Sequence, residues 1–311
     1  MAKHTILTEN QVRDIALSFS IKISNYRPIE AGEANTSYLL EDSNDQYVLT
    51  IFETKTKKEV LEIAKILDYL KGHNYPTTKL ISPSNNHRIH EFEGKPLLIK
   101  KWIQGGNLRE NPIQDYLPIG ESLAILHKIP APSFLSREHP FGIIEMPKSL
   151  GHGIDPGYEI WLQDKIAYIN KYLPSSLPKC FIHGDLFDDN ILVDQREFIS
   201  IIDFEDSCKY FRAYDLGSIL FGVCIEKGKL NKSRASQILK GYQKISKLKS
   251  EEIDAIQFFT IYAGAAISAW HYMAYNIQHP NPKMKNWHQQ TMRKTEQIFQ
   301  MTKEEFSNLI N

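Results

Sequence analysis

The spacing of hydrophobic residues along this chain follows two patterns, and the pattern changes near residue 103. Before that point, two stretches with apolar residues at helical spacing are separated by short runs rich in β-branched and aromatic residues. The helical stretches are residues 8–20 and 56–71. One strand is predicted after the small residues within 29–40, and further strands at 47–52, 88–92 and 97–102. Two helices and two hairpins predict a small α+β unit.

The rest of the chain has mainly helical periodicity. The predicted helices are 119–129, 160–173, 214–227, 233–246, 250–275 and 285–309. Residues 130–157 are rich in proline and glycine, so we expect them to run irregularly over the surface. Residues 103–107 have the composition of a hinge, and 311 residues exceed the usual size of a single core. We therefore predict a bilobal α+β protein with a β-rich N-lobe, residues 1–102, and a larger, mainly helical C-lobe, residues 103–311.

Composition and charge exclude several classes of protein. Lysine plus arginine and aspartate plus glutamate both number 37, so the overall charge does not favour nucleic acid as a partner. The most apolar stretch, residues 258–270, is too short to cross a bilayer, and residues 1–10 lack the apolar core of a signal peptide. Three cysteines without a Cys-x-x-Cys pair indicate a reducing compartment. We therefore expect a cytoplasmic protein that binds neither nucleic acid nor membrane.

The strongest chemical signal lies in residues 181–193. Two apolar, β-prone runs flank the loop His183-Gly184-Asp185-Leu186-x-x-x-Asn190, and a further apolar run ends at Asp203. We expect a strand–loop–strand ribbon to deliver Asp185, Asn190 and Asp203 to one place. The spacing of His183, Asp185 and Asn190 matches the catalytic loop of kinase-fold enzymes. The sequence therefore predicts phosphoryl transfer from a metal–nucleotide complex.

Each polar residue of this motif has a chemical reason. Asp185 would accept the proton of an attacking hydroxyl group, as the catalytic base. Asn190 would give a neutral oxygen ligand to Mg²⁺, and Asp203 a charged one, because Mg²⁺ takes few carboxylates and completes its shell with phosphate oxygens and water. His183 is expected to hold the loop rather than to react.

Three other chemistries fit the sequence less well. The acids are clustered in one loop, whereas a glycosidase places two carboxylates on either side of a sugar. The chain has no His-Glu-x-x-His motif for a metal hydrolase and no Gly-x-Ser-x-Gly motif for a serine hydrolase.

A small-residue loop precedes the first hairpin. Residues 31–37 read Ala-Gly-Glu-Ala-Asn-Thr-Ser, and such a loop can direct backbone N–H groups toward phosphates. The candidate nucleotide-binding residues here are Gly32, Asn35 and Thr36. Taken alone, the pattern is also that of an ordinary hairpin, since no Gly-x-Gly-x-x-Gly motif is present.

The chain resembles the aminoglycoside phosphotransferase/choline kinase superfamily of small-molecule kinases. The matching residues are His183-Gly184-Asp185…Asn190, Ile202-Asp203-Phe204-Glu205 and Tyr214-Asp215-Leu216. Within the superfamily it is most similar to the kinase-fold homoserine kinases, in residues 32–38, 47–53 and 213–216. The resemblance implies a protein-kinase-like fold with ATP and Mg²⁺ as cofactors and a small hydroxyl compound, homoserine or a related amino alcohol, as acceptor.

The resemblance also implies a hinge beside adenine at residues 100–104, with Lys100, Trp102 and Ile103 as nucleotide-binding residues. Thr50 stands where many superfamily members have a lysine or arginine for the phosphates, which leaves Lys55 or Lys57 for that role. For the acceptor, we expect an ammonium group to meet Asp188, Glu205 or Asp206 and a carboxylate to meet Arg212 or Arg109.

The sequence leaves other functions open. Homoserine kinases tend to carry an arginine in the helix that here reads Ala263 to Trp270, which has none. An aminoglycoside or choline-type phosphotransferase is an alternative of the same class, and Thr50 keeps a nucleotide-binding pseudokinase open. A protein kinase is disfavoured because only about ten residues separate Phe204 from Tyr214-Asp215, too few for a long activation loop.

Overall fold

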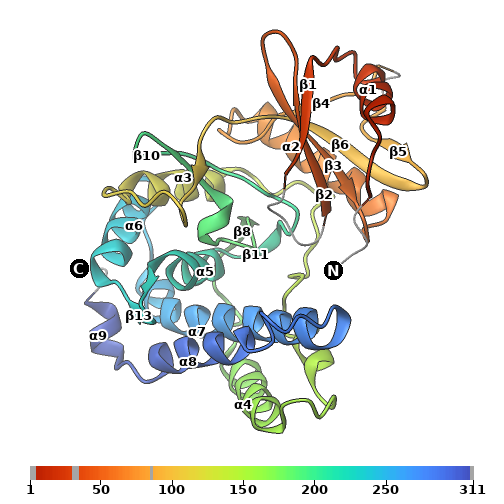
Figure 1. Cartoon of the computed structure of the whole chain (residues 1–311). Helices are drawn as coiled ribbons and strands as arrows, with labels where there is room; N and C mark the ends of the chain where they lie inside the picture. The colour runs from red at the N-terminus through yellow and green to blue at the C-terminus, as the bar shows by residue number, and fades with distance from the viewer. Residues whose placement is uncertain (1–4, 30–34, 85–86, 309–311) are drawn as a thin grey trace. The chain divides into compact units, whose positions relative to one another are not determined.

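The computed structural model describes residues 5–29, 35–84 and 87–308, and it divides the chain into two compact units, Met1–Gln104 and Gly105–Asn311 (Figure 1). Each unit is described separately below.

The first unit is built on one antiparallel sheet. Its strand order is β1-β2-β3-β6-β4, and β5 also pairs with β6. The elements are α1 (Glu9–Ser18), β1 (Asn25–Ile29), β2 (Asn35–Glu41), β3 (Gln46–Phe52), α2 (Lys57–Gly72), β4 (Leu80–Ile81), β5 (His90–Phe92) and β6 (Lys95–Lys101).

Alternation along the strands gives this sheet two apolar faces. Tyr47, Leu49 and Ile51 of β3 pack with α1 on one face, while Phe52 and Leu98 pack with α2 on the other. Successive side chains of a strand point to opposite faces, so the apolar run of β3 can serve both helices. The sheet between two helices is the core of this unit.

The second unit is mainly helical. Its helices are α3 (Leu117–Lys128), η1 (Met146–Ser149), α4 (Pro156–Tyr172), η2 (Asp188–Asn190), α5 (Arg212–Cys224), α6 (Lys232–Ile245), α7 (Ser250–Tyr272), η3 (Met273–Gln278), α8 (Trp287–Phe299) and α9 (Lys303–Ser307). Its strands are β7 (Gly106–Asn107), β8 (Lys179–Ile182), β9 (Ile191–Asp194), β10 (Glu197–Ile201), β11 (Cys208–Phe211), β12 (Ile225–Glu226) and β13 (Lys229–Leu230). Aromatic and small residues of α5 and α7 form much of the core.

The predicted fold class is confirmed, because an antiparallel sheet with two helices precedes a helical second unit. Several details differ. The predicted helix 285–309 is two helices, α8 and α9, because Thr302 caps a new helix by accepting a hydrogen bond from the N–H of Glu305. Helix α7 passes into the π-helical segment η3. Strand β1 was not predicted.

The expected strand–loop–strand ribbon is wrong as a single unit. Strand β8 pairs with β11, whereas β9 pairs with β10 and β7, so the strands on either side of the loop lie in two separate small sheets. The loop therefore joins two sheets.

The three cysteines are free thiols, and Cys208 and Cys224 are buried. Among the described residues, no helix is long and apolar enough to cross a bilayer.

Helices α3 and α6 approach each other at two glycines. A Cβ on Gly120 would lie 1.9 Å from the backbone oxygen of Ile238, and a Cβ on Gly241 would lie 2.1 Å from the backbone oxygen of Leu117. Since each glycine faces the backbone of the opposite helix, any side chain at either position would force the helices apart.

We expect Gly241→Ala to lower the free energy of unfolding by about 1–3 kcal/mol, because the added methyl group has no space. Gly72→Ala is the matched control: Gly72 is exposed near the end of α2, and nothing lies within 4 Å of its missing Cβ. That change should be neutral or stabilise by about 0.5–1 kcal/mol. Chemical denaturation of both variants tests the difference, and equal midpoints would contradict it.

Candidate active site

The loop between β8 and β9 turns sharply at Gly184. Its φ angle is +90°, in the left-handed region that favours glycine. A Cβ at this position would lie 2.5 Å from the backbone oxygen of Asp206, so the backbone at Asp206 also excludes a side chain. Asp185 follows directly, and the loop then passes through η2 into β9.

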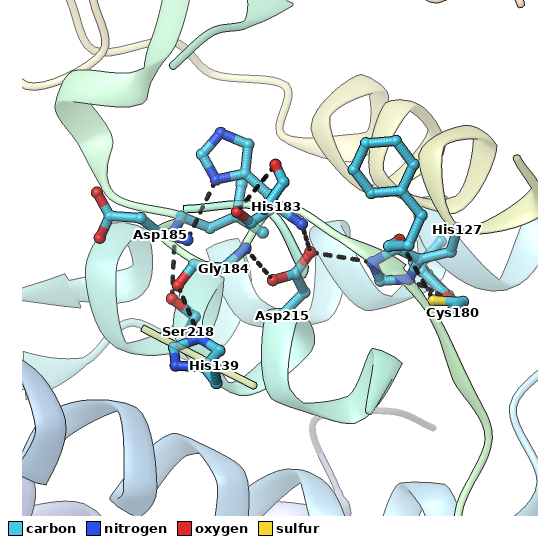
Figure 2. A network of polar contacts seen from close by, with 12 residues as sticks. His127, His139, Cys180, His183, Gly184, Asp185, Asp215 and Ser218 are labelled. Carbon is cyan, nitrogen blue, oxygen red and sulfur yellow. Dashed lines mark hydrogen bonds and ion pairs between the residues drawn. The ribbon is translucent and has the colours of Figure 1, made fainter. Parts of the chain in front are cut away.

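The carboxylate of Asp215, in the first turn of α5, holds this loop by its backbone (Figure 2). Its Oδ2 accepts hydrogen bonds from the N–H of His183 at 2.7 Å and from Nε2 of His127 at 3.0 Å. Its Oδ1 accepts from the N–H of Gly184 at 2.9 Å. Asp215 and His183 have no exposed surface. The loop is therefore anchored to a buried negative charge.

The charge of Asp215 is maintained by its neighbours. Burial raises the pKa of this carboxyl group, but hydrogen bonds from His127 and Gly184 and the nearby histidine rings outweigh burial and hold the pKa below its usual value. Nδ1 of His127 lies 2.9 Å from the hydroxyl of Tyr242. Because Nε2 faces the carboxylate and carries the proton, Nδ1 accepts the hydroxyl proton of Tyr242.

The ring of His183 lies between the loop and the chain that enters from β10. Its Nδ1 accepts the N–H of Asp185 at 3.2 Å, and its Nε2 lies 2.8 Å from the carbonyl oxygen of Ile202, to which it donates. The ring packs edge-on against Phe204. These contacts are those of a residue that holds the loop.

Asp185 and Asn190 contact each other directly. Nδ2 of Asn190 donates to the backbone oxygen of Asp185 at 2.9 Å and to its Oδ2 at 3.1 Å. The five-residue spacing thus returns the amide to the carboxylate, as the sequence predicts.

Several negative charges converge on Asp185. Burial and then the charges of Asp206, Asp203 and Asp189 raise the pKa of the Asp185 carboxyl group well above its usual value, although the Asn190 hydrogen bond lowers it. Asp203 is exposed and has a φ angle of +66°, which is uncommon for a residue other than glycine. The structure therefore brings Asp203 within electrostatic reach of Asp185.

This arrangement is suited to a divalent cation that also binds phosphates. Among the described residues, no group of three or more His, Cys, Asp or Glu side chains could hold a metal by protein ligands alone. Asn190 and Asp203 could supply two oxygen ligands, and a cation beside them would relieve the crowding of carboxylates. Mg²⁺ with phosphate and water ligands fits this donor set better than a structural zinc ion.

Arg109 neutralises part of the loop. Its guanidinium group forms ion pairs with Asp188 at 2.7 Å and with Asp189 at 3.2 Å. Burial lowers the pKa of Arg109, but the two aspartates outweigh it and raise the pKa overall. Asp188, predicted to meet an ammonium group, already has a cationic partner in the protein.

Arg212 is committed to a different contact, so its predicted role as a carboxylate ligand needs correction. One edge of its guanidinium group, Nε and Nη2, donates to both carboxylate oxygens of Glu252, which is fully buried. Nη1 donates to Ser246 Oγ at 2.9 Å, and Nη2 also donates to the backbone oxygen of Lys247 at 3.1 Å. Freeing Arg212 for a ligand would leave the carboxylate of Glu252 buried and unpaired. Glu205 and Asp206 are half-buried and follow Asp203 directly.

The predicted nucleotide-binding residues of the first unit lie in two places. Gly32 falls outside the described residues. Asn35 and Thr36 begin β2, and Oδ1 of Asn35 is buried without a hydrogen-bond partner among the described residues. Lys100 lies near the end of β6, with Trp102 and Ile103 directly after it.

Thr36 and Glu53 belong to one buried cluster. Glu53 accepts hydrogen bonds from the Thr36 hydroxyl at 2.5 Å, from the N–H of Thr5 at 2.8 Å and from Lys95 Nζ at 2.5 Å. Burial raises the pKa of Glu53, but these donors outweigh it and lower the pKa to about 2. The hydroxyl of Thr36 is therefore used within the protein.

Thr50 is buried in β3, opposite Ser37 of β2 and Leu98 of β6. Lys57 forms an ion pair with Glu91 at 2.5 Å, whereas Lys55 is half-buried just after β3. Lys57 thus has a carboxylate partner in β5.

Residues that contact the loop network without having been predicted to act there include His127, Tyr242 and His139. Nε2 of His139 lies 3.2 Å from the carbonyl oxygen of Gly184. His127 and Tyr242 stand at apolar positions of their helices, and His139 lies in the irregular segment 130–157. None of these positions has a motif that would distinguish a site residue from a core residue.

Comparison with known proteins is consistent with this geometry. The family model described as the phosphotransferase enzyme family (APH) matches residues 25–246. A homoserine kinase of Bartonella henselae is 29% identical over 265 residues, which cover 82% of this chain and 83% of that protein. Among solved structures, an amicoumacin kinase in complex with AMP-PNP and Ca²⁺ has a TM-score of 0.74 at 14% identity, covering 96% of this chain and 97% of that one. A microcompartment-associated aminopropanol kinase has a TM-score of 0.71 at 17% identity, covering 92% and 95%.

The anchoring role of Asp215 can be tested by Asp215→Asn. The amide keeps the size of the side chain, but its NH₂ group must face an N–H donor, so we expect a loss of about 2–4 kcal/mol of stability. Asp164→Asn, at an exposed position of α4, is the control and should change stability by less than about 0.5 kcal/mol. Urea denaturation measures both; an Asp215→Asn protein as stable as the control would exclude the buried anchor.

Proposed function

The chain belongs to the phosphotransferase enzyme family and is a small-molecule kinase, and we propose that it uses ATP and Mg²⁺ to phosphorylate a hydroxyl group of a small polar metabolite, homoserine or a related amino alcohol. The observation that supports this most directly is the hydrogen-bonded pair of Asp185 and Asn190, with Asp203 within electrostatic reach. A base beside metal ligands is the arrangement that phosphoryl transfer to an alcohol requires.

In the proposed reaction, the hydroxyl group of the acceptor donates its proton to the Asp185 carboxylate. The acceptor oxygen forms a bond to the γ-phosphorus as the bond to the β,γ-bridging oxygen breaks, and ADP leaves. The raised pKa of Asp185 makes it a stronger base than an exposed carboxylate. The carboxylate must be unprotonated to act, so the rate should fall at low pH.

Asn190 and Asp203 are the residues that would hold Mg²⁺. When bound, the metal neutralises charge that develops on the phosphate oxygens. Asn190 has a second task in this proposal, because its NH₂ group holds the carboxylate of Asp185 and its oxygen would be the atom that binds the metal. One side chain would thus fix the distance between base and metal.

For the nucleotide, we propose contacts from two segments of the first unit. The strand start at Asn35 and Thr36, with Gly32 before it, would lie against the phosphates, and Lys100, Trp102 and Ile103 would lie beside the base. Lys55, half-buried just after β3, is the lysine proposed for the phosphates. These assignments follow the resemblance to kinase-fold enzymes.

For the acceptor, homoserine is supported by relatives 24–29% identical that bear the name homoserine kinase. Glu205 and Asp206 remain the residues proposed for an ammonium group. Arg212 is withdrawn as a carboxylate ligand, because Glu252 occupies it. An amino alcohol without a carboxylate would need no such ligand, and the similarity in fold to an aminopropanol kinase keeps that class in the proposal.

Substitutions separate the base from the metal ligands. Asp185→Asn should lower kcat on the order of 10³-fold, and raising the Mg²⁺ concentration should not restore it, because the lost group is a base. Asp203→Asn should cost 10³-fold or more at low Mg²⁺ and recover in part at high Mg²⁺, because a lost ligand weakens metal binding. Asp164→Asn again serves as control. Undiminished turnover in Asp185→Asn would refute the proposed base.

An acceptor panel tests the substrate. The purified protein is incubated with ATP, Mg²⁺ and, separately, homoserine, 1-amino-2-propanol, ethanolamine, choline and kanamycin, and the phosphorylated products are detected by ³¹P NMR. We expect the highest kcat/KM with homoserine or an aminopropanol, and loss of activity in EDTA. A preference for choline or kanamycin would contradict the proposed acceptor. Thermal stabilisation by Mg-ATP without any transfer would indicate a pseudokinase.

A further inference from the structure

His139 is a buried histidine outside the predicted motif, in the irregular segment between α3 and α4. It is 6% exposed and lies among three aromatic rings, with its ring centroid 4.1 Å from that of Tyr214, 5.5 Å from Tyr210 and 6.0 Å from Phe141. Burial lowers its pKa to about 4, so the ring is neutral at ordinary pH.

The hydrogen bonds of His139 define which nitrogen carries its proton. Nδ1 accepts the backbone N–H of Phe141 at 3.1 Å, so in the neutral ring the proton is on Nε2. Nε2 lies 3.2 Å from the carbonyl oxygen of Gly184 and donates to it (Figure 2). Both ring nitrogens are therefore used, and one of them reaches the catalytic loop.

The carbonyl group of Gly184 and the N–H of Asp185 belong to the same peptide plane. The two groups point in opposite directions within this plane. His139 donates to the oxygen at one edge, and Nδ1 of His183 accepts the N–H at the opposite edge at 3.2 Å. Asp215 holds the preceding N–H of Gly184 at 2.9 Å. The peptide plane between Gly184 and Asp185 is thus held by a hydrogen bond at each of its two edges.

A hydrogen bond at this point has a larger effect than at an ordinary residue. Glycine has the greatest backbone freedom, and Gly184 cannot be replaced by a stiffer residue because of its φ angle and the contact with Asp206. Rotation of the plane after Gly184 would swing the carboxylate of Asp185 away from Asn190. External hydrogen bonds therefore supply the rigidity that the residue itself lacks.

We propose that His139 is a positioning residue for phosphoryl transfer, which fixes the Gly184–Asp185 peptide plane and through it the direction of the Asp185 carboxylate. The inference rests on the proposed function, in which Asp185 is the base. His139 touches neither substrate nor metal in this proposal, so its effect falls on the chemical step and not on the binding of either substrate.

Three substitutions at this position separate hydrogen bonding from packing. In His139→Gln the amide nitrogen can reach the place of Nε2 and donate to Gly184. In His139→Asn the side chain is one bond shorter and does not reach the carbonyl group. His139→Phe fills the volume of the ring but has no donor. Tyr210→Phe, which keeps a ring against His139, is the control for packing.

We expect His139→Asn and His139→Phe to lower kcat about 10–100-fold, the size of effect that small misplacements of a reacting group have. KM for ATP and for the acceptor should stay within about twofold, and His139→Gln should recover kcat to within about threefold of the native enzyme. Melting temperatures are recorded for all variants.

Packing alone predicts the opposite order, with Phe better than Gln, and that result would overturn the proposal. Should His139→Phe fail to fold, the Gln and Asn variants decide, because equal losses of kcat in both would also overturn it. Asp185→Asn is measured in the same assay. A native enzyme without transfer, or an active Asp185→Asn variant, refutes the proposed function, and the positioning role falls with it; normal rates in all His139 variants refute the positioning role alone.

Discussion

The buried charge of Asp215 is the constraint on which the loop that carries Asp185 depends. A carboxylate without water must be surrounded by donors, and here two of the three donors are backbone N–H groups of the loop itself. The chain therefore has little choice of path at His183 and Gly184. Asp215 also lies in the first turn of α5, where the helix dipole favours a negative charge. The hydrogen bonds that the buried carboxylate of Asp215 requires thereby fix the backbone position of Asp185.

The parts of the site that sequence alone could predict are those fixed by short spacing. Asp185 and Asn190 are five residues apart in one loop, and the structure joins them by a hydrogen bond. Helices α1 and α2 and the two hairpins of the first unit also follow from local periodicity, whereas strands β1 and β4 were not predicted. The split of residues 285–309 into two helices depends on one threonine cap, which an amphipathic pattern does not reveal.

What could not be predicted depends on partners distant in the sequence. Arg212 resembled a free cation near the motif, but its partner Glu252 lies 40 residues further on. His139 lies in a segment without periodicity, and its contact with Gly184 spans 45 residues. Strand β8 pairs with β11 rather than with its neighbour β9 for the same reason. In each case the structure depends on the pairing of a buried polar group or a strand edge with a residue distant in the sequence. A local sequence pattern does not contain that information.

The two glycines between α3 and α6 have a meaning beyond helix packing. Helix α3 provides His127, and α6 provides Tyr242, the residue next to Gly241, so the hydrogen bond between them spans the gap that the glycines set. The distance between the two helices thus affects the position of Asp215, which is linked to Tyr242 through His127. A substitution at Gly120 or Gly241 would therefore disturb the contacts of Tyr242, His127 and Asp215, although neither glycine takes part in them. The set of positions that are sensitive to substitution therefore extends beyond the residues that contact the Asp185 loop directly.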